Sequence, residues 1–136
     1  MTDKQIELVQ TSYAQVEPIA EQAAALFYGR LFDIAPEVRS MFGDDMDEQG
    51  RKLMATLGLV VRGLNDLDSI VPAAKRLGER HVDYGVTDDQ YPIVGEALLW
   101  TLAAGLGDAF TDEVAAAWAG AYGLLSGVMT SATENA

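Results

Sequence analysis

Apolar residues recur at helical spacing along almost the whole chain, and no stretch alternates apolar and polar residues convincingly as a β-strand would. The first stripe follows Thr2 and Gln5, whose three-residue spacing is that of a capping box at a helix start. Its apolar positions are Ile6, Val9, Tyr13 and Val16. Helical spacing and capping signals continue to the end, which predicts a single all-α domain spanning residues 1–136, with six or seven helices.

Proline and acidic residues punctuate the first half of the chain. Pro18 is expected to open a helix that runs to about Asp33, and Pro36 a short helical segment that ends near Phe42. The run GDDMDE at 43–48 is expected to form a turn and the start of the next helix. Its carboxylates lack the spacing of a calcium-binding loop, so we interpret them as capping and surface groups.

The second half is divided by similar signals. The helix that follows GDDMDE is predicted to run to about Leu64. The two helices after it are predicted to end near Gly85 and near Leu106. The expected capping residues of the last three helices are Asp68, Thr87 with Gln90, and Thr111. In the last helix, one face carries Trp118, Tyr122, Leu125 and Met129.

Three polar residues lie on apolar faces of these predicted helices. His81, the only histidine of the 136 residues, shares an arc with apolar positions, while charged residues occupy the opposite arc. The apolar neighbours in its arc are Ile70, Ala74 and Leu77. Gln49 begins an otherwise apolar stripe, and Tyr28 lies on the apolar side of its helix. These residues place an imidazole, an amide and a phenol inside a predicted core.

Composition narrows the functional classes. The formal net charge of −12 would repel phosphate backbones and anionic lipid headgroups, so nucleic-acid and membrane-surface binding are disfavoured. The absence of cysteine excludes disulfides, thiolate metal sites and cysteine nucleophiles, and it fits a cytoplasmic location. The segment from Val114 to Thr133 is uncharged, but it is rich in small residues and is expected to be a buried helix. The first residues show no secretory signal.

The lone imidazole allows two interpretations. A buried histidine satisfied by a hydrogen bond is the simpler one. The other is a metal ligand, since a neutral imidazole binds iron or copper well. With one histidine and no cysteine, the chain supplies a single strong nitrogen ligand. A macrocycle that brings four nitrogens removes this difficulty, so the pattern is most economically explained by His81 as an axial ligand of haem.

Six segments together resemble a known family, in order and with matching spacing over nearly the whole chain. They are FYGRLF (27–32), PEVRSMF (36–42), EQGRKL (48–53), RHVDYGV (80–86), YPIVGEALL (91–99) and AWAGAY (117–122). The chain is similar to the bacterial single-domain haemoglobins and to the globin domain of flavohaemoglobins. The resemblance implies the globin fold, a three-over-three helical sandwich, with haem b as cofactor.

The resemblance also assigns roles residue by residue. It implies His81 as the proximal iron ligand, and Tyr28 and Gln49 as the polar groups of the distal pocket. The residues that it implies around the haem are Phe42, Leu53, Val86, Tyr91 and Leu98. Gly50 matches a small residue that lets two helices cross closely, with Ala24 opposite it.

Two departures from the family bear on function. In the relatives a glutamate of the last helix hydrogen-bonds the proximal histidine, and Thr133 occupies that position here. The flavin and nicotinamide domains of flavohaemoglobins have no counterpart in this sequence, so a reductive cycle would need a separate reductase.

Three functions remain open. The first is reversible binding of O2, with CO and NO as further ligands. The second is nitric oxide dioxygenase activity with an external reductase. The third is a haem-free globin-like sensor or interaction module, which leaves three inward-facing polar residues without a shared reason.

Overall fold

The computed structural model describes residues 2–83 and 90–134, and side chains within 2–66, 68–79 and 90–129. All its regular secondary structure within these ranges is helical. No strand occurs in these ranges. The elements are α1 (Asp3–Val16), η1 (Glu17–Ile19), α2 (Ala20–Ile34), η2 (Pro36–Met41), α3 (Met46–Arg62), α4 (Leu67–Asp83), α5 (Tyr91–Leu106), η4 (Gly107–Ala109) and α6 (Asp112–Glu134). The predicted all-α class is confirmed.

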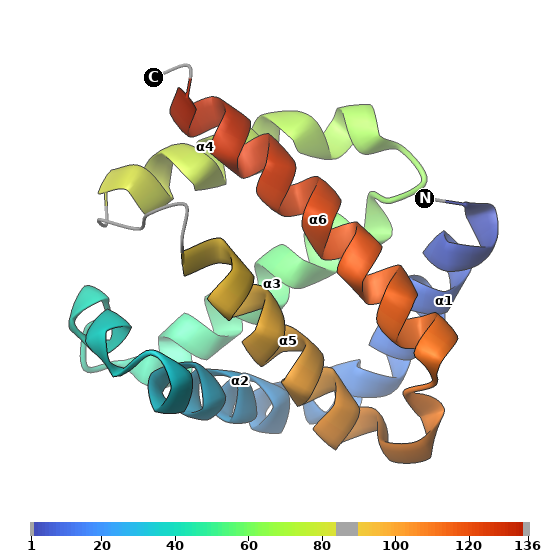
Figure 1. Cartoon of the computed structure of the whole chain (residues 1–136), viewed down its shortest axis with the longest axis horizontal. Helices are drawn as coiled ribbons and strands as arrows, with labels where there is room; N and C mark the ends of the chain where they lie inside the picture. The colour runs from blue at the N-terminus through green and yellow to red at the C-terminus, as the bar shows by residue number, and fades with distance from the viewer. Residues whose placement is uncertain (1, 84–89, 135–136) are drawn as a thin grey trace.

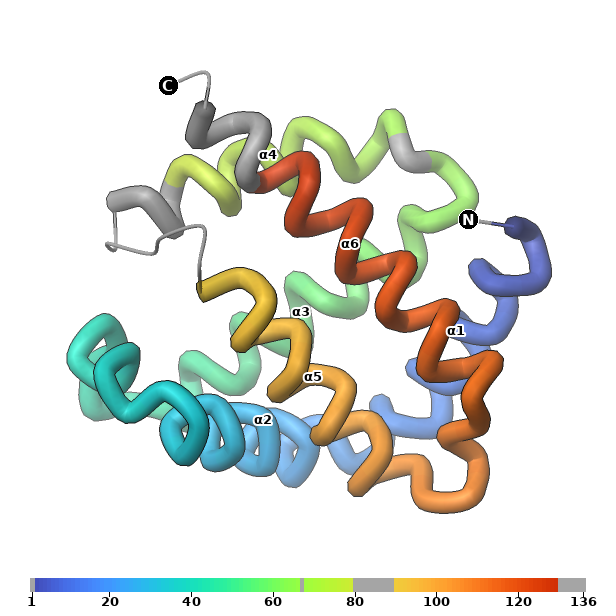
Figure 2. Tube along the Cα trace, viewed as in Figure 1, coloured from blue at the N-terminus to red at the C-terminus, as the bar shows by residue number. Residues whose placement is uncertain are grey.

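The helices form two layers. In Figure 1, α2, α5 and α6 lie nearer the viewer, and α1, α3 and α4 lie behind them. Figure 2 shows along the Cα trace how α5 and α6 cross in front of the rear layer. Contacts of α6 with α1 and α4, and of α2 with α3, join the two layers. The core between them contains Val9 and Leu102, and its largest fully buried side chain is that of Trp118.

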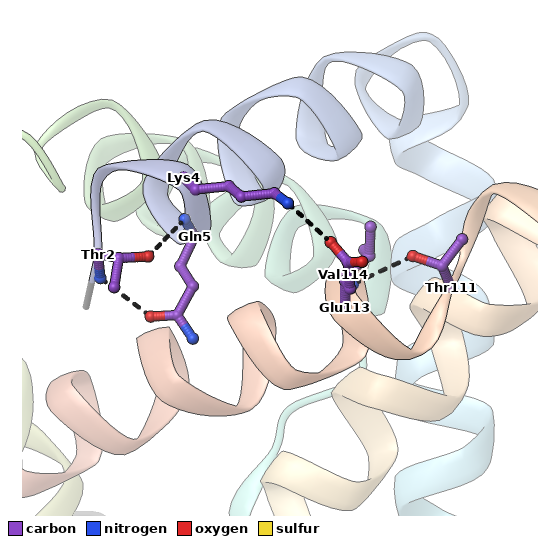
Figure 3. A network of polar contacts seen from close by, with 6 residues as sticks. All are labelled: Thr2, Lys4, Gln5, Thr111, Glu113 and Val114. Atoms are coloured by element: carbon purple, nitrogen blue, oxygen red, sulfur yellow. Dashed lines mark hydrogen bonds and ion pairs between the residues drawn. The ribbon is translucent and has the colours of Figure 1, made fainter.

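Local capping signals explain where several helices begin. Thr2 and Gln5 form the predicted capping box, with the Gln5 amide 3.1 Å from the Thr2 hydroxyl. Asp45 caps α3 by accepting from the Glu48 amide at 3.0 Å, and Thr111 caps α6 by accepting from the Val114 amide at 3.3 Å. Figure 3 shows the first and last of these caps beside the ion pair that joins the starts of α1 and α6.

One predicted cap is wrong. Asp68 lies in the first turn of α4, because that helix already begins at Leu67. An acidic side chain in a first turn still interacts favourably with the helix dipole, so the residue type suits either position. Gly85 and Thr87, the predicted stop and start residues around 84–89, lie outside the described residues.

The uncharged segment of the last helix packs against the core along one face, while residues such as Leu124 on its other face are exposed. Four side chains of α6 are buried in the core of the domain, namely those of Val114, Ala117, Trp118 and Ala121. Within the part of the chain that the structure describes, no helix combines the length and apolarity needed to cross a membrane. The predicted helix is therefore confirmed, but its described part is buried along one face only.

Candidate functional site

Two of the predicted polar site residues meet between α2 and α3. Tyr28 comes from α2 and Gln49 from the first turn of α3, and the Gln49 Nε2 atom donates to the Tyr28 Oη atom at 3.4 Å. The Tyr28 side chain is buried, with 6% exposed, and Gln49 is half-buried. A hydrogen bond of this length is near the outer limit for N–H···O geometry and is therefore weak. Because the Tyr28 oxygen accepts in this bond, the Tyr28 hydroxyl proton takes no part in it.

Aromatic rings surround the Tyr28 phenol. Its ring lies edge-on to Phe42 at 5.4 Å between centroids and stacks on Phe32 at 6.0 Å. Phe32 and Phe42 also pack edge-on at 5.6 Å, so the three rings form a closed triangle. Phe27 adds a further edge-on contact with Tyr28 at 5.0 Å. Such pairs contribute about 0.5–1.5 kcal/mol each beyond area burial, so they restrict where the hydroxyl can point.

Burial keeps the Tyr28 hydroxyl protonated. Desolvation raises the pKa of Tyr28 above its ordinary value, and the hydrogen bond from Gln49 offsets part of this rise. At neutral pH the group is therefore a neutral O–H, which can donate a hydrogen bond as well as accept one.

The close crossing of α2 and α3 depends on a glycine. A Cβ atom added at Gly50 would lie 2.9 Å from the Ala24 Cβ atom, so no larger residue fits without a shift of one helix. This is the opposition of Gly50 and Ala24 that the sequence predicted. Because Gly50 directly follows Gln49, the same crossing brings the Gln49 amide to Tyr28.

The other predicted wall residues lie on the helices around this pair. Leu53, one turn after Gln49, is half-buried and packs against the core, as does Phe42. Leu98 and Tyr91 of α5 are buried. The Tyr91 backbone carbonyl accepts from the Tyr122 hydroxyl of α6 at 2.7 Å, a contact that fixes the start of α5 and that the sequence did not reveal.

The predicted proximal side is only partly described. His81 lies in the last turns of α4, and its side chain is outside the described residues, as are Val86 and the side chain of Thr133. On the described part of α4, Ile70 and Ala74 are buried and the charged residues of the opposite arc are exposed. The described part of α4 therefore has the predicted apolar face, and the orientation of His81 on it stays a prediction.

The packing of α4 is one-sided. Among the described residues, α4 packs extensively against α6 and has no comparably extensive contact with α2, α3 or α5. The face of the domain that carries Tyr28, Gln49 and Leu53 is thus built by α2 and α3 with little help from α4.

Comparison with known proteins identifies the family. The globin profile matches residues 25–129 of this chain. The chain belongs to the globin family. The globin fold expected from the resemblance is confirmed, with its three-over-three arrangement of helices.

Individual relatives are consistent with this assignment. A flavohemoprotein of Rhizobium meliloti is 37% identical over 106 residues, covering 76% of this chain and 26% of its own length. One of Bacillus subtilis is 29% identical over 129 residues, covering 93% of this chain and 32% of its own. This globin chain therefore spans about a third or less of these relatives.

Solved structures give the same fold. A bacterial globin from Campylobacter jejuni has a TM-score of 0.88 at 24% identity, and the match covers 98% of this chain and 97% of that one. An engineered carbene transferase, a candidate nitric oxide dioxygenase from Rhodothermus marinus, has a TM-score of 0.87 at 26% identity and covers 96% and 92%.

Proposed function

We propose that this globin holds haem b on His81 and reversibly binds O2 on the side of Tyr28 and Gln49, with CO and NO as alternative ligands. The observation that carries the proposal is the Tyr28–Gln49 pair, in which a buried phenol and an amide from two helices meet at 3.4 Å. Family membership supports it, since the matched relatives are named flavohemoproteins. The proposed cellular role is storage, delivery or buffering of O2 in the cytoplasm.

The described residues suit a haem group. A planar apolar ring requires apolar walls on both faces and few competing charges. The proposed wall residues are Phe42, Leu53, Val86, Tyr91 and Leu98. Of these, Tyr91 and Leu98 are buried, and Phe42 and Leu53 are half-buried against the core. A long, weak hydrogen bond between two core-facing polar groups also favours a third partner, because each group retains unused bonding capacity.

The haem group would supply an iron that takes a diatomic ligand in its sixth position. Tyr28 would donate its hydroxyl proton to that ligand, and Gln49 would either donate beside it or hold the phenol in place. A hydrogen bond to a ligand with partial negative charge contributes about 1.5–3 kcal/mol, which corresponds to about tenfold to a hundredfold slower escape. The aromatic triangle would keep the phenol aimed at one position.

The first test is the visible spectrum of the purified protein. We expect an intense haem band near the blue edge of the visible range, with distinct ferrous, O2 and CO forms. A protein that shows no such band after haem addition would be the haem-free module instead. His81→Ala should lose haem, while Tyr28→Phe should retain it, which separates the proposed ligand from the proposed distal donor.

A second candidate function is nitric oxide dioxygenase activity with a separate reductase. The similarity to flavohemoproteins and to the Rhodothermus marinus protein favours it. The chain's own part would be the same: Tyr28 and Gln49 would orient the bound diatomic ligand. The test is nitric oxide consumption under air with a flavin reductase and nicotinamide supplied. Steady turnover with nitrate as product would favour this function, and a single stoichiometric reaction would favour the carrier.

A further inference from the structure

We infer that Arg39 is a positioning residue for the distal pair: it fastens η2 to α2 and thereby fixes Phe42, the Tyr28 phenol and the start of α3. The inference rests on the proposed function, because it concerns the residues that would face the bound ligand. Arg39 is exposed at the surface, but on this inference it affects how fast the ligand is released from the interior.

The contacts of Arg39 connect two elements. Its Nη1 atom donates to the backbone carbonyl oxygens of Phe42 and Gly43, each at 3.2 Å. Its guanidinium carbon lies 5.5 Å from the centroid of the Phe32 ring on α2, within the range of a cation–π interaction. One side chain therefore touches the backbone after η2 and the aromatic face of α2 at the same time.

Two of the three rings around the distal hydroxyl are involved. Phe32 and Phe42 are the rings that close the triangle on Tyr28. The Arg39 guanidinium lies over the Phe32 ring and donates a hydrogen bond to the backbone carbonyl oxygen of Phe42. Loss of the guanidinium would leave the direct ring contacts in place but would remove a further connection between the two elements, the one that also holds the backbone at Phe42 and Gly43.

The backbone that Arg39 holds leads directly to Gln49. Residues 42–45 have no helical structure, and Phe42 is extended, with φ −112° and ψ 150°. This stretch ends at Asp45, the cap of α3, and Gln49 follows one turn later. A looser stretch would therefore shift the amide as well as the phenol, so Arg39 acts on both members of the distal pair.

The test compares Arg39→Met with Arg39→Lys in the haem-loaded protein. Arg39→Met keeps a long apolar side chain and should speed O2 release about threefold to tenfold, because only part of the lost cation–π and hydrogen-bond stabilisation is transmitted to the distal pair. Arg39→Lys keeps the charge over Phe32 but not the planar fork, so an intermediate rate is expected. Lys4→Met is the matched control: it removes a charge and an ion pair at the exposed start of α1 and should leave release unchanged.

Two further readouts separate positioning from general destabilisation. The C–O stretch of the CO form should broaden or shift in Arg39→Met, because it reports hydrogen bonding at the ligand. Amide hydrogen exchange across residues 42–45 should accelerate, while exchange in α5 and α6 should not change. Uniform acceleration over the whole chain would overturn the inference.

A double variant identifies the route of the effect. In a Tyr28→Phe background, Arg39→Met should change O2 release by a smaller factor than in the wild type, because the hydroxyl, one of the two groups through which it acts, is gone. An equal effect in both backgrounds would overturn the inference. The proposed function fails on a different result, namely the absence of haem binding or an O2 release rate that does not respond to Tyr28→Phe. The two failures are therefore distinguishable.

Discussion

Two buried polar pairs in this globin differ in how completely they are satisfied. Between α1 and α6, the Trp118 Nε1 atom donates to the Ser12 Oγ atom at 2.8 Å, and that hydroxyl is also within 2.7 Å of the Leu8 carbonyl oxygen. Both Trp118 and Ser12 are buried. Between α2 and α3, Gln49 reaches Tyr28 at 3.4 Å and remains half-buried. The first pair is short and complete, and the second is long and retains bonding capacity.

The difference separates a structural contact from a candidate binding site. A short, fully buried bond to a neutral donor has no room for a ligand, and removing one partner leaves the other unsatisfied at about 1–3 kcal/mol. The long bond from the Gln49 amide to the Tyr28 oxygen, near half-buried Phe42 and Leu53, can exchange for bonds to a third molecule. We therefore expect substitutions in the first pair to reduce stability, and substitutions in the second to alter ligand release.

The largest effect should come from Trp118→Ala. Removing the largest fully buried side chain should lower the free energy of unfolding by about 3–5 kcal/mol, through lost burial and a residual cavity. Urea unfolding followed by circular dichroism measures this. If the variant does not fold, Trp118→Phe keeps most of the volume and should show a smaller loss. A stable variant with faster O2 release would reverse the comparison.

Gly50→Ala should affect both stability and ligand release. The added Cβ atom would meet Ala24 at 2.9 Å, so α2 and α3 must separate, which should lower unfolding free energy by about 1–3 kcal/mol. The same separation should lengthen the Tyr28–Gln49 contact and speed O2 release. Gly123→Ala is the matched control, because a Cβ atom there meets nothing within 4 Å. It should be neutral or slightly stabilising in both measurements.

The cap and stripe signals show how much could be predicted from the sequence. Thr2 and Thr111 could be predicted as caps because a capping residue bonds to a backbone amide only a few residues away, whereas for α3 the sequence predicted only that the helix begins within residues 43–48. The predicted cap Asp68 lies two positions after Asp66, the residue directly before α4. Aspartate occurs at both 66 and 68, and only the backbone decides where the helix begins.

The site was predictable to a different extent. Tyr28 and Gln49 could be proposed because family resemblance and helical spacing both pointed to them, and Gly50 could be proposed from the resemblance alone. The meeting of Tyr28 with Phe42 and of Arg39 with Phe32 depends on side-chain rotamers between separate elements, and spacing carries no information on those. The Tyr122 bond to the Tyr91 carbonyl joins residues 31 positions apart and was missed for the same reason.

Gln49→Leu should have a smaller effect than replacement of the phenol. The leucine keeps the half-buried position but removes the donor that faces the Tyr28 oxygen. We expect O2 release to accelerate about twofold to tenfold, the range for one neutral hydrogen bond. Stopped-flow replacement of O2 by CO measures it. Stability should change little, and a loss above about 2 kcal/mol would mean that the amide is a structural group like Ser12.

The smallest effect should be the pH dependence of stability. The pKa of Tyr28 is raised in the folded state, so its contribution is fully present below the unfolded pKa of about 10 and is lost as pH rises through the folded pKa. Between about pH 9 and 10.5 the wild type should lose at most about 0.8 kcal/mol more than Tyr28→Phe does. Tyr13 and Tyr122, whose pKa values burial also raises, contribute equally to both proteins. If the stability of the wild type and of Tyr28→Phe changed identically with pH, the conclusion that the Tyr28 phenol is buried would be contradicted.

The most direct measurement is the O2 dissociation rate of Tyr28→Phe, with Ser12→Ala and the apolar exchange Leu53→Met as controls. The account predicts that Tyr28→Phe releases O2 about tenfold to a hundredfold faster, with little change in stability. Ser12→Ala should lose about 1–3 kcal/mol of stability, and neither control should change release by more than about twofold. A Tyr28→Phe rate within twofold of the wild type would contradict the claim that this phenol holds the bound ligand.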